Sequence, residues 1–400
     1  MVSAFDAGLR HAVHFYNTAL SINRAYLKGN ESLRVALSLF DSNWENIQKG
    51  QAWSTANKEK HPLARHACRR IAVLEILDLR QQFEERISWL QSGFEASELL
   101  NDIQGKADTT AKLGVVYAKK GNLDTAIACY EKALSLYIEI SDRLGESNQL
   151  GNLGMAYAAK GDAKKAIQFY EKALTIDREI GDRRGEGADL GNLGNAYFYL
   201  GDYETALFYN QQHLNIARDI GDRQGEGEAL GSIGAIQDAM GQVREALEYH
   251  YAYLAIASEI GDKRGEATAL GNIGVALEQI DEIEKAFQYY SQQLTLAKQI
   301  QDNRRQISAI GGLGNIYKKR GQIPQAIEQF QIQLEIANMI GERRSIGRAL
   351  FNLALCQGLR GDVDGAISLA EKSLSILDQI DDVAQNVVKD NLNRWKQAFK

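Results

Sequence analysis

The sequence predicts an all-α protein built from tandem pairs of antiparallel helices. Two observations support this prediction: one pattern returns every 40 residues, and within each row the apolar residues are spaced three and four apart. The composition agrees with it. Two prolines in 400 residues leave room for long helices, and 36 glycines must then occupy particular positions.

Rows of 40 residues that start at Asn101 stay in register without a gap as far as Ile380, which gives seven full repeats. Three columns of these rows each hold a single residue type. They are the alanines Ala126, Ala166, Ala206, Ala246, Ala286, Ala326 and Ala366, the leucines Leu134, Leu174, Leu214, Leu254, Leu294, Leu334 and Leu374, and the isoleucines Ile140, Ile180, Ile220, Ile260, Ile300, Ile340 and Ile380. Chance does not produce three invariant columns.

Each row has the pattern of a helical hairpin. Leu150, Leu153 and Tyr157 follow the helical period in the first half of the second row. Gly161 and Asp162 then separate the two apolar runs. Glycine ends a helix in the left-handed conformation and aspartate caps the next one, so a short turn is expected here and at the equivalent Gly-Asp pairs between rows.

A further column places glycine inside the first helix, where it costs about 1 kcal/mol relative to alanine. Its members are Gly114, Gly154, Gly194, Gly234, Gly274 and Gly314. We expect a close approach of the second helix to offset this cost, with Tyr130, Tyr170, Tyr290 or Phe330 filling the space. The remaining apolar faces can then be buried only by the next hairpin.

The repeat resembles the tetratricopeptide repeat. The residues that match its signature are Leu153, Gly154, Tyr157, Gly161, Ala166, Tyr170 and Ala173. This resemblance covers about residues 101–380 and implies a right-handed superhelical solenoid of antiparallel helix pairs. The usual repeat has about 34 residues, and the six additional residues Gly181 to Glu186 resemble the extended repeats of spindle-orientation adaptors and, more loosely, of kinesin light chains. Gly191 to Tyr197 and His213 to Ala217 resemble those adaptors closely, but their G-protein-binding motifs are not found here, so only the cargo-groove role is implied.

Two further segments precede the array. Residues 61–100 keep the apolar columns but lose the glycine and alanine markers, which predicts a degenerate repeat. Residues 1–60 are expected to form an N-terminal helical cap, with helices at 3–28 and 31–56 separated by Lys28, Gly29 and Asn30. Part of this cap resembles the helical segment before the tetratricopeptide array of bacterial STAND-class signalling NTPases, although no phosphate-binding GxxxxGK[ST] motif is present. The matching residues are Leu39, Phe40, Asp41, Trp44, Asn46, Ile47, Gln51, Ala52 and Trp53.

Residues 381–400 are expected to form a C-terminal capping helix, because helical arrays need a polar outer face at their ends. Val388, Leu392, Trp395 and Phe399 stand there at helical spacing among charged residues.

The resemblance implies that first helices line a concave groove that binds a peptide. The column of Asn152, Asn192, Asn272 and Asn352, interrupted by Ser232 and Gly312, would hydrogen-bond the main chain of an extended partner, because an amide offers both a donor and an acceptor. The alternative is that asparagine is simply tolerated at a solvated helical position. The candidate groove residues are Asn152, Asn192, Asn195, Phe198, Tyr199, Asn272, Asn315, Lys318, Lys319 and Asn352.

Two features bear on how the groove could be specialised. A carboxylate clamp of the chaperone-binding kind is not expected, because Ala111, Val115, Gly151 and Gly191 occupy its first positions. The second-helix column changes from alanine in the first rows to His213, Tyr253, Gln293 and Gln333. Either this change alters the packing of the hairpin and the superhelical pitch, or small neighbouring residues compensate for it.

A net charge of −6 argues against a general nucleic-acid binder. The basic stretch from Lys58 to Arg70 is the local exception, and a solvated face is the usual role of such a run. There is no apolar run near the roughly 20 residues of a membrane span, and residues 1–20 do not have the pattern of a secretory signal. We therefore expect a cytoplasmic protein without a membrane or nucleic-acid partner, and the atypical ends favour a monomer.

No catalytic residue, metal site or cofactor is predicted. Cys68, Cys129 and Cys356 lie far apart without a CxxC motif. His11 and His14 are one turn apart but lack a third ligand at suitable spacing. The sequence thus favours a scaffold that binds a protein or peptide over an enzyme. The alternative function is a signal sensor, either a peptide-responsive regulator or the detached sensing arm of a STAND-type NTPase system.

Overall fold

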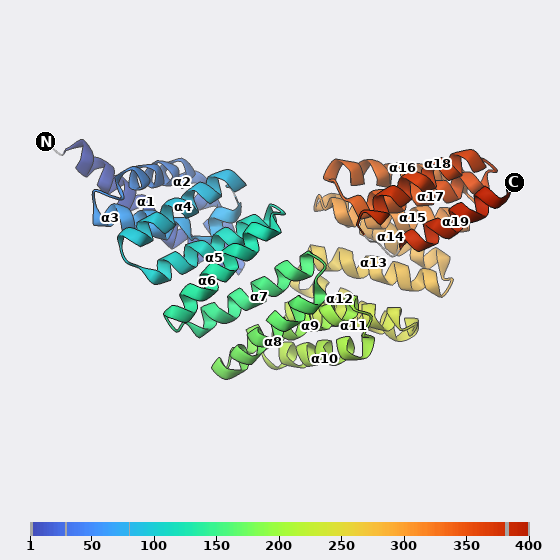
Figure 1. Ribbon diagram of the computed structural model, residues 1–400, viewed down its shortest axis with the longest axis horizontal. Coiled ribbons are helices and arrows are strands. Elements are labelled where there is room, and N and C mark those ends of the chain that lie inside the picture. The colour runs from blue at the N-terminus through green and yellow to red at the C-terminus, as the bar shows by residue number, and fades with distance from the viewer. Residues whose placement is uncertain (1–2, 29, 80, 381–383, 399–400) are drawn as a thin grey trace. The chain divides into compact units, whose positions relative to one another are not determined.

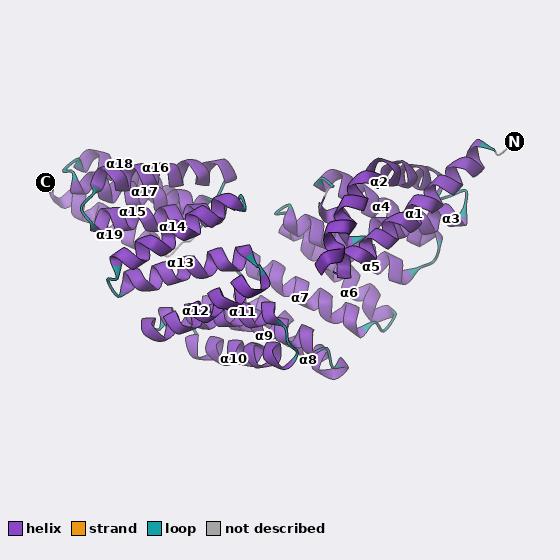
Figure 2. Cartoon of the chain, turned by 180° about the vertical axis from the view of Figure 1, so that it is seen from behind, coloured by secondary structure: helices purple, strands orange, loops and turns teal. Residues whose placement is uncertain are grey.

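The computed structural model describes residues 3–28, 30–79, 81–380 and 384–398. Over these ranges the chain forms nineteen α-helices and one 3₁₀-helix, and they contain no strand. The fold divides into two compact units, residues 1–200 (unit 1) and residues 201–400 (unit 2). In both units short turns join the helices (Figure 1 and Figure 2).

Unit 1 contains α1 (Ala4–Lys28), α2 (Asn30–Asn57), α3 (Pro62–Ala72), the 3₁₀-helix η1 (Glu75–Leu79), α4 (Phe83–Leu99), α5 (Ile103–Lys119), α6 (Leu123–Glu139), α7 (Arg143–Ala159), α8 (Ala163–Ile180) and α9 (Arg183–Tyr199). Unit 2 contains α10 (Tyr203–Asp219), α11 (Arg223–Ala239), α12 (Val243–Ile260), α13 (Lys263–Gln279), α14 (Ile283–Gln299), α15 (Asn303–Lys319), α16 (Ile323–Ile340), α17 (Arg343–Leu359), α18 (Val363–Asp378) and α19 (Ala384–Ala398). None of these helices combines the length and the apolar composition that crossing a bilayer requires.

Every 40-residue row from residue 101 to residue 380 holds two helices, as the sequence predicts. The odd-numbered helices α5 to α17 are the first helices of the rows, and the even-numbered helices α6 to α18 are the second. Within each unit, a second helix packs both on its own first helix and on the first helix of the next row, as α14 does on α13 and α15. The stacking of hairpins therefore buries the apolar face that a single hairpin would leave exposed.

The turns use the predicted chemistry. Gly161 and Gly181 lie in the left-handed region, with φ of 84° and 74°. The carboxylate of Asp162 accepts a hydrogen bond from the Lys165 main-chain N–H at 3.1 Å, and Asp182 accepts one from that of Gly185 at 3.0 Å. Other rows place Ser141, Asp281 and Gln301 in the same left-handed conformation, with φ of 58°, 62° and 54°. The hairpin geometry therefore holds even where glycine is missing and a side chain must adopt a disfavoured backbone.

The glycine column inside the first helices has the predicted cause. A Cβ added to Gly154 would lie 2.5 Å from Cε1 of Tyr170, and one added to Gly314 would lie 2.5 Å from Cε1 of Phe330. The same ring contact occurs at Gly114 and Gly274, and in the fourth row the His250 ring takes this place against Gly234. Glycine is therefore needed because the aromatic ring of the second helix rests directly on the first helix.

The segment at residues 61–100 differs from the rows that follow it, because the stretch before α4 is broken into α3 and η1. Buried Arg86 of α4 donates to the main-chain carbonyl of Leu74 at 3.0 Å and pairs with Asp78 at 2.9 Å. Asn23 of α1 accepts a hydrogen bond from the Ile76 N–H at 3.0 Å and donates to Glu75 at 2.8 Å. These side chains satisfy the main-chain groups that the break exposes, which is why this row tolerates the loss of the repeat pattern.

The segments expected to cap the array contain helices α1, α2 and α19. Helices α1 and α2 pack on each other around buried Phe40 and Ile47, and Gly29 lies outside the described residues. At the other end, α19 packs on α18 through buried Val388 and Leu392. Residues 381–383 and Phe399, which the sequence assigns to this cap, also lie outside the described residues.

The basic stretch from Lys58 to Arg70 is largely engaged within the chain. Lys58 pairs with Glu95 at 3.0 Å and Arg69 pairs with Asp102 at 2.7 Å. Arg65 donates to the main-chain carbonyl of Glu59 at 2.7 Å, at the turn between α2 and α3. These contacts tie the turn after α2 to α3 and α4, and α3 to the N-cap of α5, so much of the stretch has a structural role rather than forming a solvated face.

We expect the two glycines of α7 to respond in opposite ways to alanine. Gly154→Ala should lower the free energy of unfolding by roughly 1–3 kcal/mol, because its Cβ would collide with Tyr170. Gly151→Ala, on the same helix, should raise it by up to about 1 kcal/mol, because the nearest atom to its Cβ is 3.7 Å away and alanine favours the helix. Urea unfolding followed by circular dichroism measures both. Equal effects of the two substitutions would contradict this explanation of the glycine column.

Unit 1 also buries two carboxylic acids in its core. Asp177 of α8 is 4% exposed and Asp189 of α9 is 5% exposed, and each has one buried side-chain oxygen without a hydrogen-bond partner among the described residues. Burial raises the pKa of Asp189 to about 8, and the charges of Asp177 and Asp182 act in the same direction. Burial likewise raises the pKa of Asp177, and a hydrogen bond with Ser147 opposes this rise. Asp189 is therefore mostly protonated in the folded chain at neutral pH.

This burial predicts that stability falls as the pH rises. An aspartate has a pKa of about 3.9 in an unfolded chain, so folding takes up a proton at Asp189 between about pH 4 and pH 8. Its favourable contribution is complete below that window and is lost as the pH rises through it. Asp189→Asn should remove this dependence and raise the free energy of unfolding at pH 8 by a few kcal/mol, at about 1.4 kcal/mol per pKa unit.

The control is Asp390→Asn, which changes an exposed aspartate of α19. Unfolding midpoints of the wild type and both variants, measured from pH 4 to pH 9, test the prediction. If the Asp189→Asn curve stayed parallel to that of the wild type, the raised pKa would be refuted.

Candidate functional site

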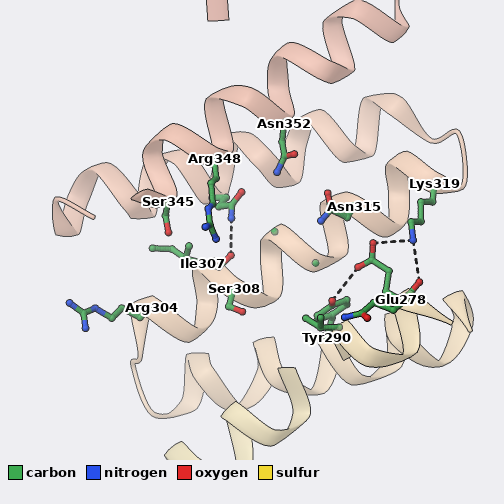
Figure 3. A pocket seen from close by; sticks show the side chains of 15 residues that line it. Glu278, Tyr290, Arg304, Ile307, Ser308, Asn315, Lys319, Ser345, Arg348 and Asn352 are labelled. Carbon is green, nitrogen blue, oxygen red and sulfur yellow. Dashed lines mark hydrogen bonds and ion pairs between the residues drawn. The ribbon is translucent and has the colours of Figure 1, made fainter. Parts of the chain in front are cut away.

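The first helices of unit 2 form a continuous wall, because α11 contacts α13, α13 contacts α15 and α15 contacts α17. A hollow of about 530 Å³ lies on this wall, and we call it the first-helix groove (Figure 3). Most of its lining comes from α13, α15 and α17. The lining residues are Val275, Glu278, Gln279, Tyr290, Arg304, Ile307, Ser308, Gly311, Gly312, Asn315, Lys319, Gln333, Ser345, Arg348 and Asn352.

Two adjacent glycines of α15 shape the floor of the groove. A Cβ on Gly312 would lie 2.5 Å from the Tyr290 ring, and one on Gly311 would lie 2.5 Å from the Gln333 amide nitrogen. Tyr290 and Gln333 belong to second helices, so the glycines let second-helix side chains reach through to the groove. The Gln333 amide donates to the Ile307 carbonyl at 3.1 Å, which fixes it in place. The larger residues in this second-helix column are therefore accommodated by small neighbours on the first helix.

The walls carry amide and hydroxyl groups at helical spacing. Ser308 and Asn315 stand on α15, and Ser345 and Asn352 stand on α17 (Figure 3). Asn315 accepts a weak hydrogen bond from Lys318 at 3.4 Å. Within the described part of the chain, the Asn352 amide makes no hydrogen bond. An amide without an intramolecular partner at a solvated wall can bind a ligand at little cost in lost protein contacts.

One end of the groove is closed by an internal ion pair. The Lys319 ammonium lies 3.2 Å from the Glu278 carboxylate and donates to the Glu278 carbonyl at 3.3 Å. The Tyr290 hydroxyl donates to the same carboxylate at 3.2 Å. Burial and the Glu278 charge raise the pKa of Tyr290 well above its usual value, so its hydroxyl remains a donor. Lys319 and Glu278 largely neutralise each other (Figure 3).

A second hollow, of about 730 Å³, adjoins the first where α13, α15 and α17 begin. Arg304 lines both hollows. The residues around the second hollow are Arg264, Gln301, Asp302, Asn303, Arg304, Arg305, Ile340, Gly341, Glu342, Arg343, Arg344 and Ile380. Its lining is therefore dominated by arginine.

Three of the candidate residues predicted in unit 2 line the first-helix groove: Asn315, Lys319 and Asn352. Asn272 is half-buried on α13 and is not part of the lining. Lys318 is not part of the lining, and its ammonium lies 5.8 Å from the centre of the Phe330 ring. Burial lowers the pKa of Lys318. Its packing among apolar groups makes it part of the hairpin core more than of the groove wall.

The other five candidates lie on unit 1. Asn152 of α7 is half-buried and its amide donates to Gln149 at 3.4 Å. Asn192 of α9 is half-buried and Asn195 is exposed. Phe198 and Tyr199 form an edge-to-face pair with ring centres 6.1 Å apart, and Tyr199 is 78% exposed. Tyr199 thus offers a large accessible aromatic surface.

The arginines and serines of the groove are not among the residues predicted from the sequence. Arg304, Ser308, Asn315 and Lys319 follow one another at spacings of four, seven and four residues, which place them on one face of α15. Ser308 and Arg304 lie one and two turns before Gly312, the position of the asparagine column on α15, so extending that column toward the start of the helix would have identified them. Tyr290 and Gln333 carried no such signal, because nothing in a second-helix sequence shows that its side chain reaches the opposite wall.

Among the described residues, no group of three or more histidine, cysteine, aspartate or glutamate side chains is arranged to hold a metal ion. The three cysteines form no disulfide, and burial raises the pKa of the Cys68 thiol.

Comparison with solved structures finds helical-repeat proteins of low sequence identity. The quorum sensor NprR from B. thuringiensis, in its apo form, has a TM-score of 0.64 at 13% identity, over 84% of this chain and 95% of that one. A Rap protein complexed with Competence and Sporulation Factor has a TM-score of 0.55 at 14% identity, over 98% of both chains.

A STAND protein with a tetratricopeptide repeat sensor from Pyrococcus horikoshii has a TM-score of 0.56 at 19% identity over 88% of this chain. The present chain covers 54% of that protein. These likenesses concern the fold. A comparison with curated protein sequences finds no significant match.

The tetratricopeptide repeat family model matches residues 106–179, 150–219, 186–259, 225–299 and 305–379. These overlapping matches span more than half of the chain and coincide with the helix pairs α5 to α18. The chain belongs to the tetratricopeptide repeat family.

Proposed function

We propose that the chain is a protein-binding scaffold that holds an extended segment of a partner in the first-helix groove of unit 2. The observation that carries this proposal is the position of Asn315 and Asn352 on neighbouring first helices around one hollow. Each amide offers a donor and an acceptor, which match the N–H and C=O of a peptide unit.

The spacing of the helices suits an extended chain. Packed helices lie about 8–10 Å apart, and an extended chain advances about 3.3–3.6 Å per residue. A segment that crosses from α15 to α17 would therefore place peptide units about three residues apart opposite Asn315 and Asn352. Ser308 and Ser345 supply further hydroxyl groups along the same walls.

The proposal extends to unit 1, where the column of Asn352 carries Asn152 and Asn192. Asn195 and the aromatic pair Phe198 and Tyr199 would contribute contacts there, because exposed aromatic side chains often dominate the energy of an interface. Asn272 and Lys318 would make additional contacts with the partner. A cytoplasmic, monomeric protein remains part of the proposal, and light scattering measures the second property.

A signal sensor is the second candidate function. It is supported by the fold likeness to a quorum sensor, to a Rap protein solved with Competence and Sporulation Factor, and to a STAND protein with a tetratricopeptide repeat sensor. A sensor must change its conformation when its ligand binds, whereas a scaffold need not.

Replacing both groove asparagines should weaken partner binding without affecting folding. Affinity capture from an extract of the source cell, quantified by mass spectrometry, should recover roughly 10 to 30 times less partner with Asn315→Ala/Asn352→Ala than with the wild type. The reason is the loss of two hydrogen-bonding amides at about 1 kcal/mol each. The control is Asn338→Ala on α16, which changes an exposed asparagine of a second helix. Equal recovery by all three proteins would refute binding in the groove.

Small-angle X-ray scattering separates the two candidate functions. For a scaffold, we expect the radius of gyration of the chain to change little when the captured partner segment is added as a synthetic peptide. A marked compaction that also disappears in Asn315→Ala/Asn352→Ala would identify a sensor instead.

A further inference from the structure

The charges around the two hollows of unit 2 are strongly unbalanced. The lining of both together includes six arginines and one lysine but three carboxylates. The basic residues are Arg264, Arg304, Arg305, Lys319, Arg343, Arg344 and Arg348, and the acidic ones are Glu278, Asp302 and Glu342. The whole chain has a net charge of −6, so this excess of positive charge is a local property of the site.

Each of the three carboxylates already has a partner within the protein. Glu278 pairs with Lys319. Asp302 lies 2.6 Å from Arg305 and 3.9 Å from Arg264. Burial opposes the ionisation of Asp302, but hydrogen bonds from Arg305 and the charges of both arginines lower its pKa. Glu342 caps α17 by accepting a hydrogen bond from the Ser345 N–H at 2.9 Å.

Arg304 has the position that a ligand would use. It lies at the meeting of the two hollows, and its side chain is exposed. No carboxylate of the described residues is within ion-pair distance of it. Arg348, exposed on the neighbouring first helix, lines the same groove one helical turn from Asn352. Figure 3 shows both arginines on the side of the groove opposite the Lys319 and Glu278 pair.

We propose that the segment bound in the first-helix groove is acidic, and that Arg304 and Arg348 bind its carboxylate side chains. This inference rests on the proposed function of the groove. A guanidinium group binds a carboxylate through two parallel hydrogen bonds, so it recognises acidic residues in preference to their amides. The positive ends of the α13, α15 and α17 dipoles add to the attraction, because all three helices begin at the second hollow.

The spacing of Arg304 and Arg348 also predicts the spacing of acidic residues in the bound segment. Arg304 and Arg348 stand on adjacent first helices, so an extended segment that meets both would carry acidic residues about three positions apart. Its main chain would lie over Asn315 and Asn352. The segment would have its acidic side at the beginning of the first helices and its neutral side toward Lys319 and Glu278.

A protein segment fits the groove better than a nucleic acid. Single-stranded nucleic acids are bound through exposed aromatic rings that stack on the bases. In the described lining of the groove the one aromatic side chain is Tyr290, which is 2% exposed. The site instead combines arginine with amide and hydroxyl groups, which suits carboxylates on a peptide main chain.

The test uses the full chain and fluorescence anisotropy. The probe is a short labelled peptide with glutamate at every third residue and alanine elsewhere, and its neutral partner has glutamine in place of glutamate. We expect the wild type to bind the glutamate peptide at least roughly tenfold more tightly. Arg304→Gln/Arg348→Gln should abolish this preference. Arg244→Gln, an exposed arginine of the second helix α12, should retain it.

Three results would overturn the inference. The first is the absence of any difference between the two peptides, and the second is an equal loss in Arg244→Gln. The third is a labelled oligothymidine strand that binds more tightly than the glutamate peptide and is lost in the double arginine variant. If the peptides do not differ but partner capture still depends on Asn315 and Asn352, the acidic preference fails while the proposed function stands. If partner capture does not depend on Asn315 and Asn352, the proposed function itself fails.

Discussion

The contact on which the rest of the fold depends is the one between a first-helix glycine and the ring above it. At Gly154 and Gly314 there is no room for even one methyl group, because the ring of Tyr170 or Phe330 rests on the helix backbone. This contact fixes the distance between the first and the second helix of a hairpin. The distance between these two helices in turn determines where the first helix of the next repeat packs, because each repeat contacts only its neighbours.

Much of the fold follows from the sequence because its signals are local. The turn at Gly161 and Asp162 is determined by two adjacent residues, and the register repeats that signal in every row. The break between α3 and η1 could not be predicted from the sequence, because the side chains that stabilise it lie on other helices. Arg86 and Asn23 satisfy the broken backbone from other helices, and neither residue signals this role in its own segment.

The candidate site was predictable to a smaller extent. Asn352 belongs to the asparagine column, and Asn315 stands three residues after Gly312, which occupies the position of that column on α15. The helical period places both on one side of the first helices. Lys318 is adjacent to Lys319 in sequence, yet the two point in different directions, because one residue step turns a helix by about 100°. Lys319 therefore lines the groove, while Lys318 packs against Phe330.

The groove also shows how one architecture can separate stability from specificity. The ring contact at Gly314 is internal to a hairpin, whereas Gly311 and Gly312, less than one turn earlier, open the helix to side chains from behind. Through that opening Gln333 and Tyr290 form part of the floor, so a change in a second helix can alter the bottom of the groove without altering its walls. Ser308, Arg304 and Arg348 are exposed and sit on the walls. Substitutions on the walls can therefore change the ligand while the glycine and ring contacts keep the repeat in register.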